Sequence, residues 1–144
     1  MLSNTFANDL LKLIFNGTAI AGLADNAASS PLTSLYLSLH TADPGAGGSQ
    51  ATSEVNYTGY SRLAVARNGT GFTITGAVMN PTATLEFGEM TGGTNQTVTH
   101  MCIGTAASGA GKVLARFTVS PTVPLQVNVT PRLRTTTTLT AVTA

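Results

Sequence analysis

The stretch SLYLSLHTADPG, residues 34–45, decides the fold, because here the chain changes from a helical period to an extended one. Three leucines alternate along one face of it: Leu35, Leu37 and Leu39. Polar or amphipathic side chains occupy the other face: Tyr36, Ser38 and His40. This period of two predicts a half-buried strand whose leucine face is buried and whose His40 face meets solvent.

Seven further strand candidates follow, separated by turn signals such as Asn68-Gly69 and Asn80-Pro81. They are residues 60–67, 71–79, 84–87, 97–104, 112–119, 124–129 and 132–142. Short strands at this spacing indicate antiparallel sheets and not alternating β-α units. The predicted fold class is therefore mainly β: an antiparallel β-sandwich or a jelly-roll-like barrel, with an N-terminal α-helix. The Thr-rich last segment suits an edge strand, or an arm that pairs with a neighbouring chain.

The helix is predicted near residues 4–15, where one apolar row consists of Phe6, Leu10, Leu13 and Ile14. Asn16-Gly17 favours a left-handed stop at its end. An Ala-rich segment then leads to Pro31 and suits a second short helical turn. We expect an N-terminal amphipathic helical segment over residues 1–30 and an antiparallel β-sandwich domain over residues 31–144.

Charge is scarce in this chain of 144 residues: 9% are charged, and the net charge is +1. No basic run indicates nucleic-acid binding, and no stretch approaches the ~20 apolar residues of a membrane span. The single cysteine, Cys102, excludes an internal disulfide. A surface with so little charge favours association. We therefore expect copies of the chain and other proteins as partners, and neither nucleic acid nor membrane. The alternative is a soluble β-domain with a Thr-coated exterior.

His40 and Asp43 raise the question of an active site at the end of the opening stretch. A catalytic pair would need a nucleophile, and the sequence holds no Gly-x-Ser-x-Gly elbow. Asp-Pro-Gly is a strong turn signal. We interpret residues 43–45 as a turn.

The segment IGTAASGAGKVL, residues 103–114, resembles a phosphate-binding loop only in part. Gly104 and Gly109 have the required spacing, but Ala110 stands where the lysine belongs. Lys112 is followed by Val113, which lacks the hydroxyl that would hold magnesium. The segment is predicted to be a hairpin turn.

Two other pairs carry possible chemistry. His100 and Cys102 lie on one face of a predicted strand, but a zinc site needs three or four ligands. Glu86 and Glu89 form a close carboxylate pair that is more typical of a solvated turn than of a glycosidase cleft. No residue is therefore predicted to be catalytic, to bind a cofactor or to ligate a metal, and no cofactor is expected.

The long loop of residues 41–59 is rich in Gly, Ser and Thr, and loops of this length are usually functional or interfacial. Tyr57 and Tyr60 beside it are the candidates for an aromatic platform that could stack against a sugar. They support an alternative function, a host-surface glycan-binding module.

Four segments, residues 6–45, 57–67, 103–114 and 129–133, together resemble a family of small proteins of tailed bacteriophages and prophages. Members are commonly labelled phage tail fibre proteins. The resemblance implies a non-enzymatic structural protein of the virion, assembled in the cytoplasm of the bacterial host. It leaves open whether such a protein is a tail-fibre component or a decoration protein of the capsid.

Overall fold

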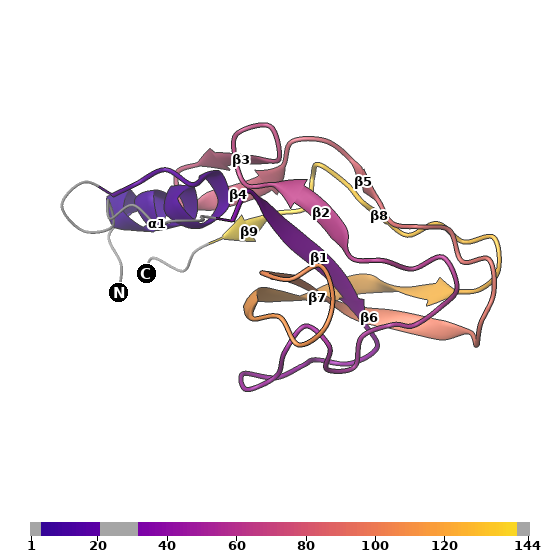
Figure 1. Cartoon of the computed structure of the whole chain (residues 1–144). Helices are drawn as coiled ribbons and strands as arrows, with labels where there is room; N and C mark the ends of the chain where they lie inside the picture. The colour runs from indigo at the N-terminus through magenta and orange to yellow at the C-terminus, as the bar shows by residue number, and fades with distance from the viewer. Residues whose placement is uncertain (1–3, 21–31, 141–144) are drawn as a thin grey trace. The chain divides into compact units, whose positions relative to one another are not determined.

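The computed structural model describes residues 4–20 and 32–140 (Figure 1). Within them the chain forms α1 (Asn4–Asn16), β1 (Ser34–His40), β2 (Leu63–Ala66), β3 (Phe72–Thr75), β4 (Val78–Pro81), β5 (Leu85–Glu86), β6 (Gln96–Gly104), β7 (Val113–Leu125), β8 (Arg132–Leu133) and β9 (Leu139–Thr140). The sheets have the strand orders β2-β1-β6-β7, β3-β4-β9 and β5-β8. The predicted mainly β class with one N-terminal helix and antiparallel sheets is confirmed. The described strands form open sheets and close no barrel.

The chain packs as two compact units, each assembled from separate segments. The first comprises residues 1–34, 66–85 and 133–144, and the second comprises residues 35–65 and 86–132. The expected boundary at residue 30 and the second helical turn before Pro31 both fall on residues 21–31, which lie outside the described residues. Both stay predictions.

The helix of the first unit buries Ala7, Leu11 and Phe15. The ring of Phe15 packs edge-on against Phe72 of β3, with 5.3 Å between ring centroids. The predicted apolar row, Phe6, Leu10, Leu13 and Ile14, is only half-buried. The buried row lies one position further along the helix, and the small Ala7 at its start adds little to the hydrophobic pattern of the sequence.

The end of α1 follows the prediction. Gly17 adopts φ 66°, the left-handed conformation expected after Asn16. The guanidinium of Arg67 also donates to the last carbonyls of the helix, with Nε 2.6 Å from Ile14 O and Nη2 2.5 Å from Leu13 O. A cation on these orphan carbonyls satisfies them and complements the negative end of the helix dipole.

Two segments that were each predicted to be a single strand are divided in the structure. Residues 71–79 form no single strand, because a turn at Gly76, with φ 61°, divides them between the β3–β4 hairpin partners. The described part of the Thr-rich segment, residues 132–140, is likewise divided, between β8 and β9. β9 pairs with β4 of the same chain and lies at the edge of its sheet.

The second unit is built on the four-stranded sheet, in which β1 and β7 both run antiparallel to β6. Leu35, Leu37 and Leu39 are buried, as predicted. Leu37 lies opposite Ile103 and Leu39 opposite Met101, and both partners are buried on the same face. The predicted strands at residues 112–119 and 124–129 are corrected to one long strand, β7, followed by a turn.

Candidate functional site

The second face of β1 is covered, and this overturns the expectation that His40 meets solvent. Ser38 and His40 both have an exposed fraction of 0%. The reason is the long loop after β1, which folds back along the strand: Glu54 forms a β-bridge with His40, and Val55 donates its N–H to Leu39 O. A period of two reports which side chains share a face, but not whether a distant loop covers that face.

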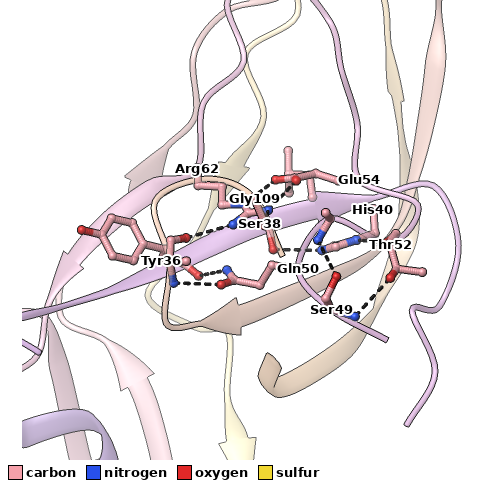
Figure 2. Close-up of polar contacts among 12 residues, drawn as sticks. Tyr36, Ser38, His40, Ser49, Gln50, Thr52, Glu54, Arg62 and Gly109 are labelled. Atoms are coloured by element: carbon pink, nitrogen blue, oxygen red, sulfur yellow. Dashed lines mark hydrogen bonds and ion pairs between the residues drawn. The ribbon is translucent and has the colours of Figure 1, made fainter. Parts of the chain in front are cut away.

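His40 has a hydrogen-bond partner at each ring nitrogen (Figure 2). Its Nδ1 lies 2.8 Å from the carbonyl of Thr52 and its Nε2 lies 2.9 Å from Ser38 Oγ. Since a carbonyl only accepts, Nδ1 carries the proton and Nε2 accepts from the serine hydroxyl. Burial lowers the pKa of His40 below its ordinary value. The imidazole is therefore held neutral, in one tautomer.

A serine hydroxyl bonded to an imidazole is the geometry of an activated nucleophile. Here neither side chain reaches solvent, so no substrate can approach the pair. Asp43 takes no place in it: its carboxylate accepts from Gly45 N at 2.9 Å and lies 3.3 Å from Arg116 Nε. The turn interpretation of residues 43–45 is confirmed by that Asp43–Gly45 bond.

Gln50 fastens the long loop to the sheet and to the β6–β7 hairpin. Its side chain is completely buried, donates to Tyr36 O at 3.1 Å and accepts from Ala106 N at 3.0 Å. Gly104 and Gly111 flank it so closely that a Cβ at either position would overlap the Gln50 side chain. Of the two glycines in the half-match to a phosphate loop, Gly104 makes room for Gln50, whereas Gly109 adopts φ 72° in the predicted hairpin.

Arg62 is the second residue that binds the long loop to the β6–β7 hairpin (Figure 2). Its Nε and Nη2 each lie 2.7 Å from a carboxylate oxygen of Glu54, and this two-point pair leaves the Arg62 side chain 2% exposed. The same guanidinium donates to Ala106 O at 3.0 Å and to Gly109 O at 2.7 Å. The hydrogen bond from Arg62 to Glu54 raises the pKa of Arg62 further, so the guanidinium stays protonated. Sequence reasoning identified neither Gln50 nor the Glu54–Arg62 pair.

The predicted aromatic platform lies inside the second unit. Tyr57 is buried, and its hydroxyl donates to Gly88 O at 2.8 Å. The ring of Tyr60 lies 5.3 Å from that of Tyr57 and 6.4 Å from that of Phe87, centroid to centroid. Its hydroxyl donates to Glu54 Oε1 at 2.7 Å, and burial raises the pKa of Tyr60. Tyr57 is therefore part of the buried core, whereas Tyr60 is half-buried, with its ring stacked on Phe87 and its hydroxyl in the polar network.

His100 and Cys102 share one face of β6, as the spacing predicts. His100 lies opposite His40, and Cys102 lies opposite Ser38, where burial raises the pKa of its thiol to about 11. Within the described residues no group of three or more His, Cys, Asp or Glu side chains could hold a metal ion. Glu86 is exposed and pairs with Arg132 at 2.8 Å, while Glu89 is exposed on the loop that follows.

A groove of about 540 Å³ lies beside this network, between residues 45–49 and 110–116. One wall is Gly45, Ala46, Gly47 and Gly48, which carries no side chain larger than a methyl. The other includes the first residues of β7, with the exposed Leu114. The groove is accessible, whereas the buried polar network is not.

Comparison with known proteins identifies the family to which the chain belongs. No helix in the described residues has the length and apolar character needed to cross a membrane. No curated protein matches the sequence. A protein family does match over residues 1–138, nearly the whole chain, and it is described as Podophage GP4 fiber I protein gp80. The chain, with its mainly β fold and its polar groups closed off from solvent, belongs to this family of phage fibre proteins.

Proposed function

We propose that this protein is a non-enzymatic structural component of the tail fibre of a podophage. The family supports a place in the virion. The observation that carries the non-enzymatic part is the burial of Ser38 and His40. They form a pair with the geometry of a nucleophile and its base, and they hold the loop of residues 41–59 against β1.

The same reasoning applies to the other polar groups of this unit. Gln50 and the Glu54–Arg62 pair bond to the backbone of the β6–β7 hairpin. Such bonds give a long loop one fixed conformation, which suits a protein that must present a constant surface in an assembly. With 9% charged residues, that surface favours contact with copies of the chain and with other virion proteins.

Imaging of intact particles tests the location. Gold-labelled antibodies against the purified protein are expected to decorate the tail fibres, and particles lacking the gene product are the control. Label over the head shell would contradict the fibre location and support a capsid decoration protein instead.

Adsorption of the purified protein tests the alternative of a glycan-binding module. A structural component is expected not to bind host cells by itself. Saturable binding that host polysaccharide competes away would contradict the proposal. Tyr57 and Tyr60, the residues that first suggested such a module, are packed within the second unit.

A further inference from the structure

The charged side chains of the second unit pair with one another, with two exceptions. The ion pairs of this unit are Glu54–Arg62, Asp43–Arg116 and Glu86–Arg132. In residues 35–65 and 86–132, all of which the structure describes, the other acidic and basic side chains, the histidines apart, are Glu89 and Lys112. Both are exposed, and neither forms an ion pair within residues 4–20 and 32–140. Each can therefore meet a charge on another molecule.

These two charges lie at opposite ends of the β6–β7 ladder, whose hairpin end and open end are separated by the length of β6 (Figure 1). Lys112 immediately precedes β7, at the hairpin end. Glu89 precedes Met90, whose backbone bonds to Asn128 and Val129, just beyond the far end of β7. The nine residues of β6 span roughly 26 Å, at about 3.3 Å per residue. Exposed charges interact over only about 8 Å at physiological salt, so these two cannot pair within one chain.

Each end of the ladder also carries an exposed large apolar side chain. Leu114 lies two positions after Lys112 at the hairpin end, and Val127 lies at the end that carries Glu89. Val127 is at the tip of the tight turn of residues 126–129, whose ends are joined by a backbone hydrogen bond of 3.0 Å. Both ends therefore combine one unpaired charge with one exposed apolar residue, and the charges have opposite signs.

The groove described above lies at the hairpin end, and Lys112 and Leu114 both line it. Its facing wall, residues 45–48, has no side chain larger than a methyl and leaves space for an apolar group. Arg116 lines the groove as well but already pairs with Asp43. Lys112 is therefore the cation that remains for a ligand, which should carry an apolar tip with a carboxylate beside it.

We propose that the occupant of this groove is the turn of residues 126–129 of a second copy. Val127 of that copy then packs against Leu114. Its Glu89 lies beside Lys112. The inference rests on the association between copies proposed above and adds the two surfaces that mediate it.

The unpaired charges give this contact its direction. Two hairpin ends would bring two lysines together and two far ends would bring two glutamates together, and like charges at a contact repel. Unlike ends join opposite charges and cover both apolar side chains. Because a head-to-tail contact leaves one end of each copy free, it builds rings or open filaments larger than a dimer.

Reversing either charge tests the pairing. Glu89→Lys and Lys112→Glu each place like charges at the contact and are expected to weaken association by roughly tenfold. In an equimolar mixture the two variants can alternate, so that every contact joins unlike charges, and association is expected to return to the wild-type level. Glu86→Lys is the control and is expected to leave association unchanged, because Glu86 is exposed but pairs with Arg132 of its own chain.

Removing the apolar tip tests the other half of the contact. Val127→Ser is expected to weaken association by roughly tenfold, because it removes apolar surface that the groove would bury. Leu32→Ser, a change at an exposed leucine of the first unit, is the control and is expected to have no effect on association.

Sedimentation velocity over a range of concentrations of the full chain measures association, and thermal unfolding checks that each variant is folded. Wild-type species larger than a dimer, weakened in each charge variant and restored in their mixture, support the inference. A wild type that stops at the dimer, or a mixture that stays as weak as its components, refutes the head-to-tail pairing.

The same experiment separates this contact from the proposed function. If the wild type associates and none of the variants differs from it, another surface joins the copies, and only this contact is refuted. If the wild type stays monomeric at every concentration, the proposed association between copies fails as well, and the partner of the groove is a different virion protein. The fibre location is tested separately, by the labelled antibodies.

Discussion

Ser38 Oγ lies 2.9 Å from His40 Nε2, and neither side chain is exposed to solvent. The two residues are two positions apart on β1 and so share a face of the strand. The carbonyl of Thr52, on the loop that covers this face, fixes the other ring nitrogen. His40 therefore connects β1 to the loop that follows it. The arrangement stabilises the fold and leaves a substrate no access to the pair.

Replacing His40 by alanine is expected to destabilise the protein by about 2–4 kcal/mol, because it leaves a cavity and removes the partner of the buried Ser38 hydroxyl and of the Thr52 carbonyl. The leucine-face pattern alone would predict an almost neutral change at this position. Chemical denaturation of the variant measures the difference in the free energy of unfolding. Thr118→Ala, an exposed change on the same sheet face, serves as the control and is expected to cost less than about 0.5 kcal/mol. Equal effects of the two changes would contradict the buried arrangement.

The stability of the wild-type protein is expected to fall as the pH is lowered from about 6.5 toward 5. The pKa of His40 is lowered by burial in the folded state, while the unfolded chain titrates near 6.5. The unfolded state therefore takes up the proton first, and the contribution of neutral His40 is lost at a slope of at most about 1.4 kcal/mol per pH unit. Urea unfolding at pH 7.5, 6.5 and 5.5 measures it. A slope in His40→Gln as steep as that of the wild type would show that other groups cause the dependence.

The local pattern of the sequence predicted the helix and the strands well, but it did not predict which of their faces are covered by other segments. The alternation of leucines identified β1, and Asn16-Gly17 identified the end of α1, because both signals lie within a few residues. The burial of His40 depends on Thr52 and on the path of a loop, which no periodicity encodes.

The same limit applies to the hydrogen bonds that hold that loop against the β6–β7 hairpin. Gln50 and Arg62 both bond to the backbone of residues 106–109, more than 40 positions away in the sequence. The charges of Glu54 and Arg62 and the glycines at 104 and 111 were visible in the sequence. That one pair would be buried, and that the glycines would make room for an amide, follows only from the tertiary structure.

Arg62→Met is expected to cost about 3–5 kcal/mol, because it leaves the carboxylate of Glu54 without its partner and two hairpin carbonyls without a donor. The chain offers a matched control in a second Arg–Glu pair. Arg132 and Glu86 lie 2.8 Å apart, but their side chains are 60% and 53% exposed. Arg132→Met is expected to cost less than about 1 kcal/mol. Denaturation curves of the two variants compare the same substitution at a buried and at an exposed ion pair. Similar midpoints would refute the expected difference in stability.

Gly104→Ala is expected to destabilise the protein by about 1–3 kcal/mol, since its new methyl group would overlap the buried side chain of Gln50. Gly47→Ala is the control, because no atom lies within 4 Å of the Cβ that it would add. Gln50→Ala removes one of two obstacles, because the carbonyl oxygen of Lys112 also lies 2.5 Å from the added Cβ and stays in place. In a Gln50→Ala background, the additional cost of Gly104→Ala is expected to be smaller than in the wild type, which a double-mutant cycle measures as a coupling free energy. Additive costs would mean that Gln50 does not determine the need for glycine at this position.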